Sequence, residues 1–271
     1  MVPVVQTLHN YRLVCANGLF MRNGKVCEAC SGKPFAWPAI RYRCYRDSLP
    51  GSIMLVLLQW IHRVIGTWKN KVDCYIALTE FAKSRFVESG VLPESIVTVK
   101  PNFIDEPNEG SEIPEKKRQA VFIGRFWPEK GCALLIEAWV KAFRERGGLN
   151  GYELVVMGDG PEREYCLELC DENPAGVSIR FAGVLPREEV IQELRRSRFM
   201  VLPSIWYEGF PMTIVEAFAC GVPVLSARVG SMRSIIEENR TGLFFEVGDS
   251  DELAALLGLS LIHISEPTRR T

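Results

Sequence analysis

The sequence predicts an α/β protein with two domains, each built around a parallel sheet. Between residues 120 and 257, short runs rich in β-branched and aromatic residues alternate with runs of helical periodicity, as in a doubly wound parallel sheet. Residues 1–104 show a shorter series of the same kind. The segment 105–119 between them is polar, contains proline and lacks periodicity, so we expect it to be a linker.

The first domain, 1–104, is predicted to begin with the strand VVQTL at 4–8, followed by a loop that carries four cysteines. An apolar helix at 52–68 comes next, but polar residues interrupt it before the roughly 18 apolar residues that a membrane span needs. We expect this helix to pack in a core or, with Arg63 and Lys69 nearby, to contact an anionic membrane. The other predicted elements are a strand at 73–78, a helix at 80–90 and a strand at 95–101.

The second domain, 120–257, is predicted to be Rossmann-like, with helical runs filling the gaps between its strands. Six runs have strand character, at 120–124, 152–158, 177–183, 199–203, 223–227 and 242–246. The segment 258–271 then abandons the helical period and contains the helix breaker Pro267. Because it resembles the peptide obtained when sequencing-adapter DNA is translated, we interpret this tail as non-native.

Charge and composition exclude some classes of partner. A net charge of −1 over 271 residues provides no general field to hold a polyanion, so nucleic acid is not an expected partner and any anion site must be local. No segment has the pattern of a secretory signal. We therefore expect a cytoplasmic protein, or one at the inner face of the membrane.

A local anion site is indicated by the stretch YEGFPMTIVEAFACGVPVL at 207–225. Pro211 suits a first helical position and Gly221 a stop, which predicts a helix at 211–220. Its first amides, among them those of Thr213 and Ile214, would lie at the carboxyl edge of the sheet, where open α/β folds bind phosphate groups. We expect Glu216, one turn on, to accept hydrogen bonds from ribose hydroxyls.

Further candidates lie in the loops. Glu208 precedes this helix, and Gly209 allows the backbone to approach a ligand closely. Arg125 and Lys130 follow the first strand of the second domain, at the same carboxyl edge, where two cations can offset a diphosphate without a metal. Each of these residues, taken alone, is also compatible with an ordinary solvated surface side chain.

Together, GRFWPEKG at 124–131 and the E-x7-E element within EGFPMTIVEAFACGVPV resemble the retaining GT-B glycosyltransferases of the family-4 type. The resemblance extends over about 250 residues, including GDGP, FAGVLPREEV, ALTEFAKSRF and VKPNFID. It implies a GT-B fold, with two Rossmann-like domains facing a cleft. It also implies transfer of a hexosyl unit from a UDP- or GDP-sugar to a glycan or lipid-linked acceptor, with retention of configuration and without a divalent metal.

The resemblance also implies roles for individual residues. Arg125 and Lys130 would hold the diphosphate and Glu216 the ribose, while the amides of Thr213 and Ile214 complete the phosphate site. His9 would approach the transferring sugar as the histidine of the acceptor-side domain. Contacts with the donor sugar would come from Glu208 and the Gly209–Phe210–Pro211 backbone, and Gly158 of GDGP would lie beside the nucleotide.

Four cysteines cluster in the first domain with the spacing C-x11-C-x2-C-x13-C, and the central pair has the spacing of adjacent zinc ligands. A structural zinc at Cys15, Cys27, Cys30 and Cys44 would fix this loop. Free thiols and disulfides are the alternatives.

Two other functions fit the same sequence. A nucleotide-sugar epimerase can share the fold, and a non-catalytic sugar-nucleotide-binding protein could use the same cations. The family's N-terminal Gly-rich loop and its final helices have no counterpart in these 271 residues. We therefore expect the chain, truncated at both ends, to bind a nucleotide sugar weakly and to transfer none.

Overall fold

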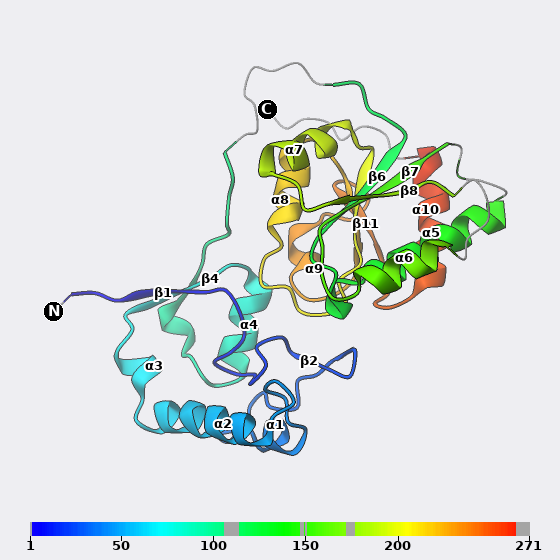
Figure 1. Cartoon of the computed structure of the whole chain (residues 1–271). Helices are drawn as coiled ribbons and strands as arrows, with labels where there is room; N and C mark the ends of the chain where they lie inside the picture. Colours follow the sequence, from blue (N-terminus) through cyan, green and yellow to red (C-terminus); the bar gives the residue numbers. More distant parts are fainter. Residues whose placement is uncertain (1, 106–113, 147–148, 150, 172–176, 264–271) are drawn as a thin grey trace. The chain divides into compact units, whose positions relative to one another are not determined.

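The computed structural model describes residues 2–105, 114–146, 149, 151–171 and 177–263, and the chain divides into two compact units (Figure 1). The first unit comprises Met1–Asn102 and Trp206–Phe210; the second comprises Phe103–Ile205 and Pro211–Thr271. The main sheet of each unit is parallel, which confirms the predicted α/β class. The short segment Trp206–Phe210 lies inside the predicted second domain, but its contacts assign it to the first unit.

The first unit contains a three-stranded parallel sheet of order β1-β4-β5. Its strands are β1 (Val5–Leu8), β4 (Cys74–Ala77) and β5 (Val97–Val99). Helix α4 (Glu80–Glu88) begins where the Thr79 hydroxyl accepts a hydrogen bond from the Ala82 amide, as expected of an N-cap. Aromatic side chains fill the core beside this sheet, namely Tyr11, Phe20, Tyr75 and Phe86.

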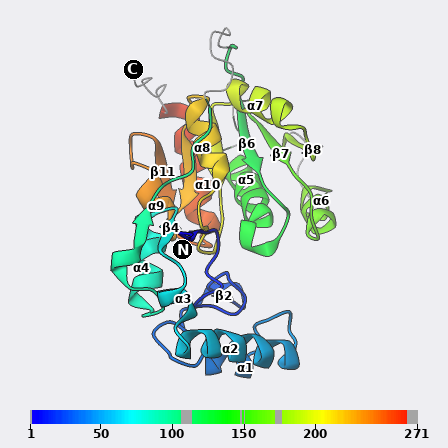
Figure 2. The same ribbon diagram turned by 90° about the vertical axis from the view of Figure 1, so that its left-hand side faces the viewer.

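The cysteine loop forms a small substructure of its own. Strands β2 (Met21–Arg22) and β3 (Lys25–Val26) pair antiparallel around Asn23 and Gly24. Both turn residues have positive φ (50° and 70°), which the tight turn of a two-residue hairpin requires. Helix α1 (Trp37–Arg41) packs against α2 (Leu49–Val64), as Figure 2 shows. The short helices α3 (Thr67–Asn70) and η1 (Glu94–Ile96) complete the unit.

Helix α2 replaces the helix predicted at 52–68, with a start three residues earlier and an end at Val64. The Ser48 hydroxyl caps it by accepting from the Gly51 amide. Of its large apolar side chains, only Val56 is buried. The expectation that this helix packs in a core is therefore wrong for most of its surface in the described part of the chain.

The second unit contains a six-stranded parallel sheet of order β11-β10-β9-β6-β7-β8. Central strands such as β6 and β9 are buried along almost their whole length, which explains their continuous apolar runs. All six predicted strands are confirmed, with ends that differ by at most two residues. Their bounds are β6 (Gln119–Ile123), β7 (Glu153–Met157), β8 (Ile179–Gly183), β9 (Phe199–Leu202), β10 (Val224–Ala227) and β11 (Gly242–Phe245).

Helices cover both faces of this sheet (Figure 1). Helix α5 (Cys132–Arg146) packs against α6 (Arg163–Asp171) and α10 (Ser250–His263), whereas α7 (Arg187–Arg196) packs against α8 (Met212–Ala219). The single-turn elements are η2 (Pro128–Lys130) and α9 (Met232–Ile235). Helix α10 continues to His263, beyond the point at which the sequence suggested a foreign tail.

Among the helices that the structure describes, none combines the length and apolar character needed to cross a membrane.

Candidate active site

The strand order of the second unit places a topological switch point between β6 and β9. From β6 the chain continues to β7 and β8 on one side, whereas β9, β10 and β11 follow one another on the other side. Open α/β sheets bind ligands outside the carboxyl ends of the strands at such a point. Arg125 and Lys130 follow β6, and Pro211, Thr213 and Ile214 follow β9, so the sheet brings these five predicted site residues to one edge.

Main-chain hydrogen bonds tie the loops at this edge to one another. The Gly124 amide donates to the Met157 carbonyl at 3.0 Å, and the Phe126 amide donates to the Asp159 carbonyl at 2.9 Å. On the other side, the Ile205 amide donates to the Glu129 carbonyl at 3.0 Å. The loop that carries Arg125 and Lys130 is thus held by the loops after both neighbouring strands.

Glycines make this close packing possible. A Cβ on Gly131 would lie 2.3 Å from the Pro203 carbonyl oxygen, and the φ of Gly131 is +71°. A Cβ on Gly158, with φ +134°, would lie 1.9 Å from the Gly124 carbonyl oxygen. Gly158 therefore has a packing reason to be glycine, and its contact with a nucleotide remains a prediction.

The two cations differ in environment. Arg125 is exposed, with its guanidinium 5.9 Å from the ring centre of Trp127, whereas Lys130 is half-buried at the end of η2. Both belong to a segment anchored by the buried ring of Phe126, which packs against Phe122 and Phe181. The anchored backbone keeps both positive charges at the switch point, where an anionic ligand would meet them.

Helix α8 starts one residue later than predicted. Pro211 is its N-cap rather than its first helical residue, and the helix ends at Ala219. The Ile214 amide donates to the Pro211 carbonyl at 3.1 Å, so its contact with a phosphate group stays a prediction in which that hydrogen bond would be shared. The amides of Met212 and Thr213, which have no partner within a helical first turn, are the better candidates.

Glu216 lies on α8 and its side chain is largely buried, with 16% exposure. Arg187 Nε, at the start of α7, lies 3.9 Å from its carboxylate, although the arginine side chain itself is 63% exposed. Burial raises the pKa of Glu216 above its usual value, and the charge of Arg187 only partly opposes this. Arg187 was not among the predicted site residues, although it lies in the FAGVLPREEV stretch that carries part of the family resemblance.

The remaining predicted site residues lie together in the first unit. Glu208 is buried, and its carboxylate accepts a hydrogen bond from Trp206 Nε1 at 3.0 Å. A Cβ on Gly209 would lie 2.9 Å from the carbonyl oxygen of His9, so the two backbones are in contact. His9 is exposed and Phe210 is half-buried. The structure thus brings His9 beside the segment that carries Glu208.

The cysteine cluster corrects the zinc prediction. Its four thiols, from Cys15, Cys27, Cys30 and Cys44, line one pocket. Across the described residues, however, no group of three or more His, Cys, Asp or Glu side chains is placed to hold a metal ion. Cys15 Sγ instead donates to Asn17 Oδ1 at 2.9 Å, and burial raises the pKa of Cys30 to about 12. All nine cysteines are free, as in the first alternative.

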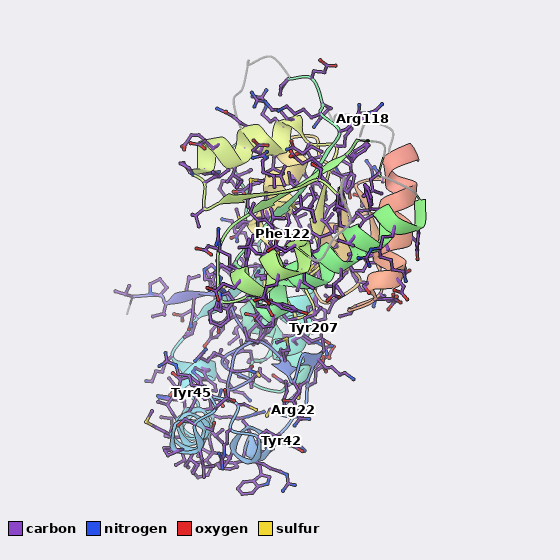
Figure 3. All side chains as sticks on the ribbon, turned by 45° about the vertical axis from the view of Figure 1, so that its right-hand side comes forward. Arg22, Tyr42, Tyr45, Arg118, Phe122 and Tyr207 are labelled. Atoms are coloured by element: carbon purple, nitrogen blue, oxygen red, sulfur yellow. The ribbon has the colours of Figure 1, made fainter. Side chains whose placement is uncertain are left out.

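The same pocket is closed on one side by a stacked pair. The guanidinium of Arg22 lies 3.8 Å from the ring centre of Tyr42, and Figure 3 shows the two side chains together beside α1.

Comparison with known sequences identifies relatives for most of the chain. The sequence profile of the glycosyl transferases group 1 matches residues 103–267. An uncharacterised glycosyltransferase of Methanocaldococcus jannaschii is 27% identical over 255 residues, which cover 93% of this chain and 58% of that protein. The D-inositol 3-phosphate glycosyltransferase of Acidothermus cellulolyticus is 27% identical over 264 residues, covering 95% and 54% respectively. The chain therefore spans somewhat more than half the length of these two relatives.

Comparison of structures gives the same fold. The HepE protein of Anabaena, solved in complex with UDP-glucose, has a TM-score of 0.62 and 19% identity, and the match covers 96% of this chain and 63% of that one. The TarM protein of S. aureus, solved with UDP and α-GlcNAc-glycerol, has a TM-score of 0.61 and 18% identity, with coverage of 72% and 38%. At this level of identity the likeness establishes the fold, which is of the GT-B kind.

Proposed function

Since the chain belongs to the glycosyl transferases group 1, we propose that its parent protein transfers a hexosyl unit from a nucleotide diphosphate sugar to a glycan or lipid-linked acceptor, with retention of configuration. One observation carries the donor assignment: Arg125, Lys130 and the start of α8 meet at the switch point of the second sheet. That combination of two cations and free helix amides suits a diphosphate. The retaining mechanism and the family-4 assignment rest on the resemblance of the motifs.

The proposed chemistry asks for electrostatic stabilisation rather than for a covalent catalyst. As the nucleoside diphosphate leaves, negative charge grows on its oxygens, and the cations of the β6 loop with the amides of α8 would stabilise it. Positive charge grows on the sugar at the same time, near the proposed positions of His9 and Glu208. Because two fixed cations can offset the diphosphate, the proposal includes no divalent metal.

The other proposed contacts with the donor follow from the position of each residue in the fold. The buried carboxylate of Glu216 would accept from the ribose, Gly158 would lie beside the nucleotide, and Glu208 with the Gly209–Phe210–Pro211 backbone would contact sugar hydroxyls. HepE was solved with UDP-glucose, which supports a UDP-sugar as the first donor to test. The named relatives are glycosyltransferases, so neither an epimerase nor a non-catalytic binding protein is favoured.

We also propose that the first unit contacts a membrane through α2. Met54, Leu58 and Val64 are 65%, 48% and 65% exposed, so this helix presents apolar surface. Arg63 does not add to a basic surface as predicted, because its guanidinium donates to the carbonyls of Lys33 and Ser89. Sedimentation with phosphatidylglycerol vesicles tests this proposal: Leu58→Glu should release the protein, whereas Val184→Glu, at an exposed apolar position of the second unit, should not.

Calorimetry with UDP-glucose, GDP-mannose and ADP-glucose tests the donor proposal. We expect saturable binding of one of the three and a matching rise in melting temperature. We also expect these 271 residues to release no glycosylated product in the presence of an acceptor, because positioning of the acceptor can account for roughly 7–11 kcal/mol of a barrier. Absence of binding by all three donors would refute the function, and robust transfer by this chain would refute the proposed inactivity.

A further inference from the structure

Tyr207 precedes Glu208 directly and makes several contacts within the first unit. Its hydroxyl donates to Glu28 Oε1 at 2.7 Å. Its ring packs edge-on against Phe81, with 4.7 Å between ring centres, and lies 5.8 Å from Phe20. Tyr207 thus joins the aromatic core of the first unit, although 179 residues separate it from Glu28 in the sequence.

Glu28 is fixed from a second direction. Arg85 Nη1 donates to both of its carboxylate oxygens, at 3.0 and 3.1 Å, and Arg85 Nη2 also pairs with Glu88. The guanidinium of Arg85 lies 5.4 Å from the ring centre of Phe81, so it is held by the same aromatic side chain as Tyr207. A carboxylate whose two oxygens both accept from one guanidinium nitrogen is a charge-assisted, oriented acceptor for the tyrosine hydroxyl.

Glu208, the next residue along the chain, is itself held by hydrogen bonds from Tyr11 and Trp206. The hydroxyl of Tyr11, which belongs to the same core, donates to the main-chain carbonyl of Glu208 at 3.5 Å. The Glu208 carboxylate is then oriented by Trp206 Nε1. Burial and the bond to Glu28 raise the pKa of Tyr207 to about 12, so the hydroxyl remains a donor throughout the neutral range.

We propose that Glu28, carried between Cys27 and Cys30, is a positioning residue that acts through Tyr207 to place Glu208 against the donor sugar. The cysteine loop then has a role without a metal: it holds one carboxylate at the base of the sugar-binding segment. This inference rests on the proposed function for the sugar, whereas the tie between Glu28 and Tyr207 is a property of the first unit alone.

Two variants and one matched control test whether the hydrogen bond between Tyr207 and Glu28 holds this segment. Tyr207→Phe keeps the packed ring and removes the donor, and Glu28→Gln removes the charge that the hydroxyl faces. Glu88→Gln also removes a carboxylate that pairs with Arg85, but no hydrogen bond joins Glu88 to Tyr207 among the described residues. Hydrogen exchange of the peptide 204–212 in the ligand-free chain should be about tenfold faster in the first two variants and unchanged in the control. Equal exchange in wild type and Tyr207→Phe overturns the proposal.

Donor affinity tests whether the hydrogen bond between Tyr207 and Glu28 contributes to binding of the donor sugar. For wild type we expect UDP-glucose to bind more tightly than UDP. Tyr207→Phe should lower that preference about tenfold while leaving the affinity for UDP unchanged, and the double variant Tyr207→Phe/Glu28→Gln should lower it no further. An unchanged preference in Tyr207→Phe, or additive losses in the double variant, overturns the proposal.

The same measurements separate this inference from the proposed function. If wild type binds neither UDP nor UDP-glucose, the proposed function fails, and the exchange rates still decide whether Glu28 and Tyr207 hold the segment. If Glu28→Gln does not fold, Tyr207→Phe alone gives both readouts, because its ring packing is retained.

Discussion

Gly158 faces the carbonyl oxygen of Gly124 so closely that a Cβ on Gly158 would lie 1.9 Å from it. The two residues directly follow the neighbouring strands β7 and β6, and the Gly124 amide donates to the Met157 carbonyl in the same region. The loop that carries Arg125 is therefore seated on the loop after β7. Any side chain at position 158 would push the two loops apart.

Gly158→Ala should destabilise the second unit and move the Arg125 loop. A side chain at φ +134° costs of order 1–3 kcal/mol, and the collision with the carbonyl adds to this. Urea unfolding measures the loss. Gly248→Ala is the matched control, because Gly248 has φ +78° and no atom within 4 Å of an added Cβ. Equal losses in both variants would show that the contact with Gly124 is unimportant.

Arg125→Ala and Lys130→Ala should each weaken binding of a nucleoside diphosphate by roughly 1.5–3 kcal/mol, about ten- to hundredfold. The reason is the loss of one charge-assisted contact with the diphosphate, so binding of the corresponding nucleoside should change little. Titration calorimetry with UDP and uridine measures both. Arg240→Ala removes an exposed arginine that precedes β11, at the opposite edge of the sheet, and should have no effect. Similar losses for UDP and uridine would contradict the diphosphate assignment.

Glu216→Gln should reduce the affinity for UDP more than the affinity for pyrophosphate. The carboxylate is proposed to accept from ribose hydroxyls, which pyrophosphate lacks. Competition binding with the two ligands measures the difference, and Arg187→Gln controls for the loss of the ion pair with Glu216. If pyrophosphate loses as much affinity as UDP, Glu216 does not bind the ribose.

The same Glu216→Gln variant should gain stability over wild type as the pH rises from 4 to 8. Burial raises the pKa of Glu216 in the folded state above its unfolded value, so the folded protein binds more protons in the interval between the two values. Stability of wild type then falls as the pH rises through that interval, and the amide, which does not titrate, avoids this loss. Urea unfolding at pH 4 and pH 8 checks the sign. A stability difference that is the same at both pH values would contradict it.

Local patterns in the sequence determined the second sheet. Its central strands, such as β6 and β9, are apolar runs because both faces of a buried parallel sheet are covered, so each of these segments carries its own local signal. The Asn23–Gly24 turn carries an equally local signal for the β2–β3 hairpin, which our sequence reasoning overlooked. The motifs after β6 and β9 could be placed at one edge because all strands are parallel.

The tertiary structure decided the features that depend on distant contacts. Four cysteines with a suggestive spacing line one pocket without forming a ligand set, because spacing does not fix the directions of their Sγ atoms. Glu216 lies beside Arg187, which no periodicity could pair with it. Tyr207 lies far along the chain from Glu28, and only the packing of the first unit brings its hydroxyl to that carboxylate. The periodicity of the sequence indicates which face of a helix or strand is buried. Tertiary packing determines which residues contact that face.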